Sequence, residues 1–273
     1  MMTDVLHLAA VALYAIAAAL LGISFARTDR RLPAVATTTL GLAVAAHGAA
    51  LASYIQEFGE PPLVGLAPSL SVLGFLIALG SLGVATLGRT GPLGLVLVPV
   101  AAAVAAAAQA AGVRPDGEAM LFRGPWFVLH VVLAMLGYAA LAVSFAAGLM
   151  YLLQFRELKG RRFGAIFRFF PPLETLDRIG RLALMAGLPL LSAALLVGWA
   201  WTERFQHPMA IGNPKIILGV ISWLVFVVAL AVRAGGSPQA RRGALVSVVG
   251  FAVVVISYVV LRVGASTHTG GFL

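Results

Sequence analysis

Hydrophobic side chains fill long runs of the chain, and short polar breaks rich in proline, glycine or arginine separate these runs. A helix needs about 20 apolar residues to cross the hydrocarbon core of a bilayer. The fourth run is rich in alanine and contains Gln109, but Gly91–Pro92 and Arg114–Pro115 mark its ends. Eight segments reach the spanning length: residues 5–25, 33–54, 63–88, 92–112, 125–153, 182–202, 214–233 and 243–264. We therefore expect an all-α polytopic membrane protein with eight transmembrane helices.

Composition narrows the chemistry that such a chain can perform. Of its 273 residues 61% are hydrophobic and 11% are charged, against roughly a quarter charged in a soluble domain. The absence of cysteine excludes disulfides, thiolate nucleophiles, iron–sulfur centres and covalent haem thioethers. The sequence has no glycine-rich phosphate loop, HExxH pair or Ser/His/Asp arrangement. Imidazole from the five histidines is the leading candidate for any chemistry, and we expect no enzymatic catalysis.

The placement of positive charge predicts the orientation. One set of alternate loops contains 14 of the 19 lysines and arginines, and the other set contains five together with six of the ten acidic residues. The positive-inside rule then puts both termini outside. We expect a multi-pass protein of the bacterial inner membrane with periplasmic termini. Because topology accounts for the net charge of +9, the lipid bilayer is an expected partner and nucleic acid is not.

The inner loop at residues 154–181 mixes arginine and lysine with phenylalanine, which is typical of a segment lying on an anionic leaflet. After Pro171–Pro172, the residues Leu173, Leu176 and Ile179 repeat at helical spacing. This predicts a short interfacial helix in the cytoplasmic loop before the sixth span.

Each histidine allows two interpretations. His130, in PWFVLHVVLAMLGY, lies a turn or two into the fifth span, either as a ligand or as a buried histidine bonded to a neighbouring helix. His47 lies roughly two turns below the outer surface, as a helix-packing residue or an inner ligand. His268, in STHTGG, is a solvated tail residue or a ligand. We interpret His7 and His207 as interfacial or solvated.

The outer loop between the sixth and seventh spans is aromatic at its start, with Trp199 and Trp201, and ends at Asn213–Pro214–Lys215. Tryptophans at this depth usually form the aromatic belt of a membrane protein, and the same residues suit a flat apolar shelf for a planar ligand. Haem combines an apolar macrocycle, two propionates and an iron that accepts imidazole. The cations available to carboxylates on this side are Arg123, Arg204, Lys215 and Arg262.

A series of motifs follows the fourth span: WFVLHVVLAMLGYAALAVSFAAGLMYLLQFRELK, PPLETLDRIG, GWAW, an outer loop ending in NPK, IILGVISWLVF and RRGALVSVVGFAVVVISYV. Their order resembles the CcsA/CcmC-type cytochrome c assembly family, and most closely its short HemX/YpjD-like branch of eight-helix membrane proteins. The resemblance covers residues 125–265, a cytochrome c assembly-like region that follows four helices within residues 1–112 of a single transmembrane domain spanning 1–273.

The resemblance implies two external histidines that bind haem and flank a tryptophan-rich segment. These histidines fall on His130 and His268, as ligands of the iron of a non-covalent haem b, and the segment falls on residues 199–215. Further cofactor-binding residues are expected in the apolar wall, at the propionates and inside the membrane: Trp126, Trp199, Trp201, Arg262, Lys215 and His47. The implied function is presentation of haem at the extracytoplasmic face during cytochrome c assembly, with other assembly proteins or another membrane complex as partners.

One departure from the family segment keeps an alternative open. The loop reads WAWTERFQHPMAIGNPK where the family has the form WGxxWxWDPKE, so its tryptophans are fewer. The alternative is a cofactor-free scaffold or regulatory subunit of the same fold that acts through its basic cytoplasmic loop.

Overall fold

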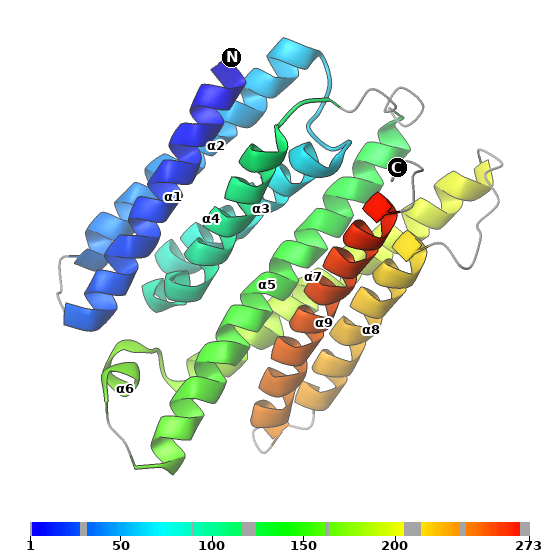
Figure 1. Cartoon of the computed structure of the whole chain (residues 1–273). Helices are drawn as coiled ribbons and strands as arrows, with labels where there is room; N and C mark the ends of the chain where they lie inside the picture. Colours follow the sequence, from blue (N-terminus) through cyan, green and yellow to red (C-terminus); the bar gives the residue numbers. More distant parts are fainter. Residues whose placement is uncertain are drawn as a thin grey trace. The chain divides into compact units, whose positions relative to one another are not determined.

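Figure 1 shows the computed structural model of the chain, which describes residues 2–27, 32–88, 90–115, 124–161, 164–204, 214–234 and 239–267, with backbone alone at 201–204, 214–215 and 258–267. Within these residues the secondary structure is helical and contains no strand. The helices are α1 (Met2–Arg27), α2 (Leu32–Phe58), α3 (Leu66–Thr86), the 3-10 turn η1 (Gly91–Leu93), α4 (Gly94–Ala111), α5 (Pro125–Lys159), α6 (Ala165–Phe169), α7 (Leu173–Arg204), α8 (Pro214–Ala234) and α9 (Ala240–Thr267).

Eight helices among the described residues are long and apolar enough to cross a membrane, which confirms the predicted number of spans. Prolines begin α5 and α8, where a missing backbone N–H costs a helix nothing. Pro99 and Pro189 lie inside α4 and α7, and both helices continue past them. The all-α polytopic fold expected from the hydrophobic pattern is therefore the observed one.

The loop before the sixth span contains a short helix, but not at the residues whose spacing predicted one. The helix is α6, on the N-terminal side of Pro171–Pro172. The repeat of Leu173, Leu176 and Ile179 instead forms the first turns of α7, which runs on without a break into the span. Phe25 on α1 holds the loop through ring contacts with Phe169 and Phe170, at centroid distances of 5.3 and 6.2 Å.

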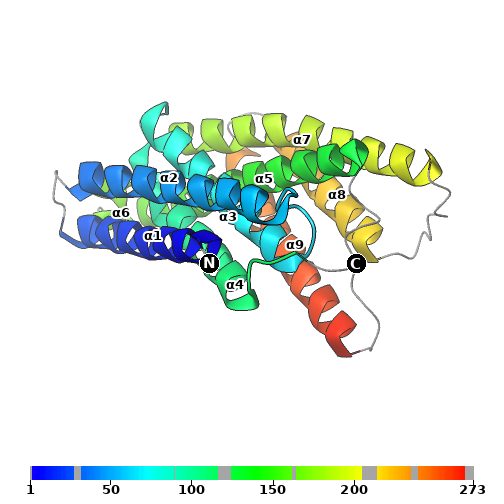
Figure 2. The same cartoon turned by 90° about the horizontal axis from the view of Figure 1, so that it is seen from above.

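The chain forms two compact units, which we describe separately. Unit 1 comprises residues 1–121 and 153–176, and therefore α1 to α4 and the loop with α6. Figures 1 and 2 show α1 and α2 side by side within it. Helices α3 and α4 approach closely because Gly74 faces the backbone of α4: a Cβ at Gly74 would lie 3.3 Å from Ala101 O and from Ala105 N. Small residues at such a contact let membrane helices pack backbone to backbone.

Unit 2 comprises residues 122–152 and 177–273, and therefore most of α5 together with α7, α8 and α9. Its buried core is formed by Leu141, Leu184, Leu191, Phe226, Ala229 and Val254. The helices meet through glycines: a Cβ at Gly187 on α7 would come within 2.8 Å of Phe226 Cζ, and one at Gly148 on α5 within 2.9 Å of Ala244 O. The interior of this unit is consequently sensitive to added volume.

A buried cation joins three helices of unit 2. Arg233, at the end of α8, donates from Nη1 to Asp177 Oδ1 on α7 at 2.8 Å and from Nη2 to Ser247 Oγ on α9 at 3.2 Å. Gly180 and Gly243 border its side chain so closely that a Cβ at either position would collide with it. The arginine therefore occupies space that these two glycines leave open.

Candidate functional site

His130, on the second turn of α5, is half-buried and bonded to a neighbouring helix. Its Nδ1 lies 2.7 Å from the carbonyl oxygen of Ala194 on α7. A carbonyl oxygen only accepts, so Nδ1 must carry the proton, and in the neutral ring Nε2 then carries the lone pair. A histidine that donates one N–H to a backbone carbonyl has the arrangement that metal-ligating histidines usually adopt. The bond to a neighbouring helix, which was one of the two interpretations of His130, is thus present, and it leaves the ring chemically suited to ligation.

The imidazole of His130 lies directly against Gly198, one turn beyond Ala194 on α7. A Cβ at this glycine would be 2.7 Å from Nδ1 and 2.8 Å from Cε1. Since no other residue type leaves this space empty, the sequence Gly198–Trp199 lets the ring rest on α7 with a tryptophan beside it. The glycine is a site residue that our sequence interpretation missed, although GWAW was among the motifs that it identified.

Two of the predicted tryptophans lie at the same end of unit 2. Trp126, one turn before His130 on α5, is 52% exposed, and Trp199 is 54% exposed. The bond between Trp223 Nε1 on α8 and Ser192 Oγ on α7, at 2.9 Å, joins the middle parts of these helices, and closer to this end a Cβ at Gly219 on α8 would lie 3.2 Å from Leu195 Cδ2 on α7. The end of α7 and the start of α8 therefore meet where α5 begins. Arg233 joins the start of α7, the end of α8 and the first part of α9, so the end of α9 lies at the same end of unit 2 as His130.

For the other residues expected around this end, the structure describes the backbone alone or does not reach them. Trp201, Lys215 and Arg262 belong to α7, α8 and α9 by backbone, and their side chains lie outside the described part of the chain. The same holds for Arg204. His268, Arg123 and His207 lie outside the described residues altogether.

His47 lies in unit 1, on α2, and is 0% exposed. Its Nε2 is 2.9 Å from Ser71 Oγ on α3, and its Nδ1 is 3.2 Å from the hydroxyl of Tyr14 on α1. Phe75 packs an edge against the ring at a centroid distance of 5.6 Å. Both ring nitrogens have protein partners, so binding of an iron to His47 would have to displace one of them.

The interpretation of His7 as interfacial or solvated is wrong. The side chain is 1% exposed and makes two hydrogen bonds, one between Nδ1 and Gln109 Oε1 on α4 at 2.7 Å and one between Nε2 and Ser71 Oγ at 2.9 Å. Its ring stands perpendicular to that of His47 at 4.8 Å between centroids. Ser71 thus connects two buried histidines, and four helices meet at this network.

A signal for His7 was present in the pattern of α1. The buried residues of this helix recur every three or four positions, and the polar ones share that face: Thr3, His7, Tyr14 and Ser24. Polar residues aligned on one stripe of a membrane helix indicate an interior face rather than a water-exposed end.

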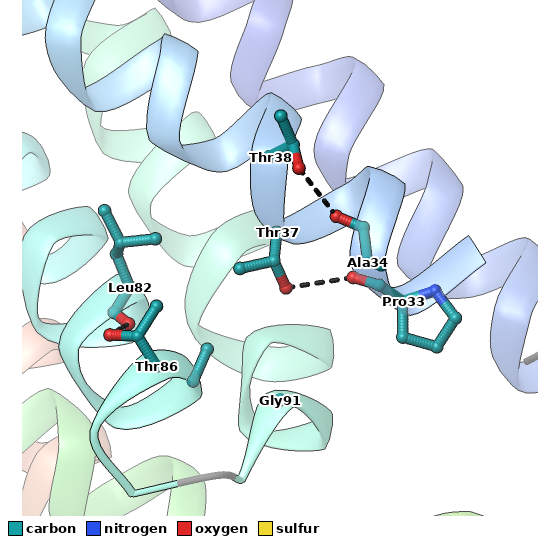
Figure 3. Close-up of a pocket in the computed structure, with 8 residues that line it drawn as sticks. Pro33, Ala34, Thr37, Thr38, Leu82, Thr86 and Gly91 are labelled. Atoms are coloured by element: carbon teal, nitrogen blue, oxygen red, sulfur yellow. Dashed lines mark hydrogen bonds between the residues drawn. The ribbon is translucent and has the colours of Figure 1, made fainter. Parts of the chain in front are cut away.

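A shallow groove in unit 1, between α2 and α3, offers no comparable chemistry. It is lined by Pro33, Ala34, Thr37, Thr38, Leu82, Ala85, Thr86 and Gly91. Its threonine hydroxyls donate to carbonyls of their own helices, at 2.9 Å for Thr37, 3.0 Å for Thr38 and 2.8 Å for Thr86 (Figure 3). These donors are engaged one turn back along the helix, so the groove presents mainly methyl groups. Among the described residues, no three His, Asp or Glu side chains are grouped as a metal site would require.

Comparison with known proteins identifies the family of the chain. The family model described as cytochrome C assembly protein matches residues 5–268 of the chain, nearly its whole length. The chain belongs to this family. The match extends beyond residues 125–265, where the motifs lie, and includes the four N-terminal helices. Membership supports a role in cytochrome c biogenesis.

Curated relatives of the chain carry the name cytochrome c biogenesis protein CcsA. The protein of Guillardia theta is 29% identical over 164 residues, covering 54% of this chain and 54% of its own length. That of Chlamydomonas reinhardtii is 26% identical over 148 residues, covering 54% of this chain and 41% of its own. The chain thus spans about half the length of these two, whereas the Microcystis aeruginosa protein is 26% identical over 290 residues with 88% of both chains covered.

Proposed function

We propose that the protein holds haem at the extracytoplasmic end of unit 2 and presents it during cytochrome c assembly, with His130 as one axial ligand and His268 as the other. The observation that carries the proposal is the bond from His130 Nδ1 to Ala194 O at 2.7 Å. It turns the lone pair to Nε2 and restrains the ring, and both effects favour binding to a metal. Family membership supports a role in cytochrome c assembly, with which haem handling is consistent.

The surroundings of His130 suit a large flat apolar ligand. Trp126 and Trp199 each keep about half of their surface exposed at this end of the unit. In the proposal, Trp126, Trp199 and Trp201 contact the macrocycle, while Lys215 and Arg262 meet the propionates. Haem brings an iron whose two axial positions accept imidazole nitrogens.

The proposal assigns binding and presentation to the protein rather than making or breaking of covalent bonds. Non-covalent haem b fits a chain without cysteine, and acceptor proteins or other assembly components are the proposed partners. Charge placement supports the orientation, because the loops opposite this end contain most of the lysines and arginines. A bacterial inner-membrane location with both termini in the periplasm follows from that orientation.

The test is the absorption spectrum and haem stoichiometry of the purified full-length protein and of three histidine variants. We expect His130→Ala and His268→Ala each to lower the haem content and alter the Soret band, and His207→Ala to match the wild type as a control of the same residue type. Retention of the wild-type spectrum and stoichiometry by both His130→Ala and His268→Ala would refute the ligand assignment.

The alternative of a cofactor-free scaffold rests on the basic loop. Arg156 and Lys159 at the end of α5 and Arg168 on α6 are exposed, and Phe25 on α1 contacts Phe169, next to Arg168. An ordered, basic surface of this kind suits a cytoplasmic partner or the anionic lipid surface. Crosslinking from introduced photoreactive residues at positions 156–170 tests this alternative: a specific protein adduct supports it, and lipid adducts alone count against it.

A further inference from the structure

The polar network of unit 1 is a continuous chain of hydrogen bonds within the interior of the helix bundle. It runs through five side chains from four helices, in the order Tyr14, His47, Ser71, His7 and Gln109, with successive distances of 3.2, 2.9, 2.9 and 2.7 Å. Tyr14, His47, Ser71 and His7 are at most 1% exposed. Polar groups buried at this depth in a membrane helix bundle are costly, and they usually mark a function.

In this arrangement, the donor and acceptor properties of the five groups fix the direction of every hydrogen bond in the network. Gln109 Oε1 only accepts, so His7 donates from Nδ1 and its Nε2 accepts from the Ser71 hydroxyl. That hydroxyl has one proton, so it accepts from His47 Nε2, and His47 Nδ1 accepts from the Tyr14 hydroxyl. With both imidazoles neutral, every proton in the chain points from Tyr14 toward Gln109.

A reversed arrangement of the same groups also satisfies them. If the Gln109 amide turns to present its NH₂ group, His7 Nδ1 accepts, and each bond up to Tyr14 changes direction. One proton then enters at the Tyr14 oxygen, the protons of Tyr14, His47 and Ser71 each move to the next atom, and the proton on His7 Nδ1 leaves at the Gln109 end. All five groups are neutral before and after the transfer, so no charge remains in the bundle interior.

The two ends of the hydrogen-bond network, Gln109 and Tyr14, differ in their surroundings. Gln109 is half-buried on the last turn of α4, which ends at Ala111 and is capped by Gly112. At the same end, Thr3 donates to Glu57 Oε2 at 2.9 Å, Glu57 is exposed, and Asp4 lies one turn from His7 on α1. Tyr14 lies about 10 Å further along α1 than His7, between the buried residues Ala10 and Ala17.

Beyond Tyr14 the interior face of α1 is apolar until Ser24, about 15 Å further along the helix. In the described part of the chain, the hydroxyls of Ser24 and of Ser81 on α3 are buried without a hydrogen-bond partner. The chain of hydrogen bonds therefore connects one end of unit 1 to its interior and stops there.

We propose that these five residues form a proton relay between the Gln109 end of unit 1 and Tyr14 in its interior. Such a relay exchanges protons between the Tyr14 hydroxyl and the Gln109 end of the unit. The inference depends on contacts within unit 1 alone and stands whether or not His130 binds haem.

The experiment measures deuterium exchange at single imidazole N–H groups by ¹⁵N-histidine NMR. The full-length protein is placed in phosphatidylethanolamine and phosphatidylglycerol bilayers and transferred to D₂O. In the wild type we expect neutral rings, with His7 protonated on Nδ1 and His47 on Nε2, and exchange at both sites. Since His47 reaches the end of the bundle only through Ser71, Ser71→Ala should slow exchange at His47 by roughly tenfold or more and change His7 less than about twofold.

Two further variants separate a relay from simple opening of the bundle. Ser71→Thr restores the hydroxyl and should restore exchange at His47. Ser81→Ala removes a buried hydroxyl from the same helix, outside the chain, and should leave both rates unchanged. Exchange at His47 that is as fast or faster in Ser71→Ala than in the wild type would overturn the proposal, because opening does not need the hydroxyl. If Ser71→Ala does not fold, the measurement on the wild-type protein tests the proposal alone. A His47 N–H that does not exchange, or a positively charged His47 ring, would then overturn the proton relay.

Discussion

Gly198 on α7 leaves His130 on α5 the space for its imidazole, since a methyl group at Gly198 would lie 2.7 Å from Nδ1. The ring must move to admit a methyl group, and its bond to Ala194 O at 2.7 Å does not survive that movement. We therefore expect Gly198→Ala to lower haem content to a level close to that of His130→Ala while the protein remains folded. Haem absorbance per folded protein measures the effect.

Gly41→Ala is the matched control for this substitution. Gly41 is also a helical glycine, on α2, and a Cβ there would meet nothing within 4 Å. Alanine in place of glycine inside a helix favours folding by up to about 1 kcal/mol. Full haem content in both variants would show that the position of the His130 ring does not matter for binding.

The ion pair between Arg233 and Asp177 predicts a large response to the loss of one charge. The two side chains are 1% and 22% exposed, and their contact is 2.8 Å. Asp177→Asn keeps the shape and removes the charge, which leaves a buried guanidinium without its carboxylate. We expect the free energy of unfolding to fall by about 2 kcal/mol, seen as an earlier thermal transition by circular dichroism in detergent. Glu174→Gln, one turn away and exposed, should change it by less than about 0.5 kcal/mol, and equal effects of the two substitutions would argue against a structural ion pair.

Packing at Gly187 predicts a destabilisation that a second substitution relieves. A Cβ there would lie 2.8 Å from Phe226 Cζ and 2.9 Å from Ala140 Cβ, so Gly187→Ala should cost about 1–3 kcal/mol by overpacking. Phe226→Leu makes room, and the double variant should be more stable than the sum of the two single effects. Additive effects would mean that the added methyl group does not meet Phe226. Gly83→Ala, where nothing lies within 4 Å of the new Cβ, controls for backbone effects.

Substitution of Gln109 tests how much the hydrogen-bond network of unit 1 contributes to the free energy of unfolding. Gln109→Leu removes the acceptor of the His7 Nδ1 bond, which is 2.7 Å long, and an unsatisfied buried donor costs about 1–3 kcal/mol. The same change at exposed Gln56 on α2 should be close to neutral. Thermal unfolding of the two variants compares them directly, and a smaller effect at Gln109 than at Gln56 would contradict the network.

The spans themselves were predictable because length and apolarity decide whether a helix crosses a membrane. The predicted starts at residues 125 and 214 coincide with the observed ones, since Pro125 and Pro214 each begin a helix. The far ends were placed too early: α5 was expected to end at residue 153 and ends at Lys159. A polar helical turn outside the hydrocarbon region continues the helix without adding to the hydrophobic run.

The side-chain contacts were less predictable, because the length of a span does not say which of its faces lies inside the bundle. His7 is interpreted as interfacial or solvated because it lies at the outer end of the first span, and its partners Ser71 and Gln109 lie 64 and 102 positions further along the chain. For His130 the fifth span indicated a bonded or ligating histidine, and the acceptor Ala194 is a backbone carbonyl that no sequence pattern marks. The helix of the inner loop was expected after Pro171–Pro172 because the spacing of Leu173, Leu176 and Ile179 does not distinguish a separate helix from the first turns of the next span.

The space shared by Arg233, Gly180 and Gly243 has an evolutionary consequence. Because the arginine fills the volume that side chains at 180 and 243 would need, the three positions are expected to covary. Homologues that retain arginine should keep glycine at both other sites, and those with a short residue in its place are free to accept alanine there.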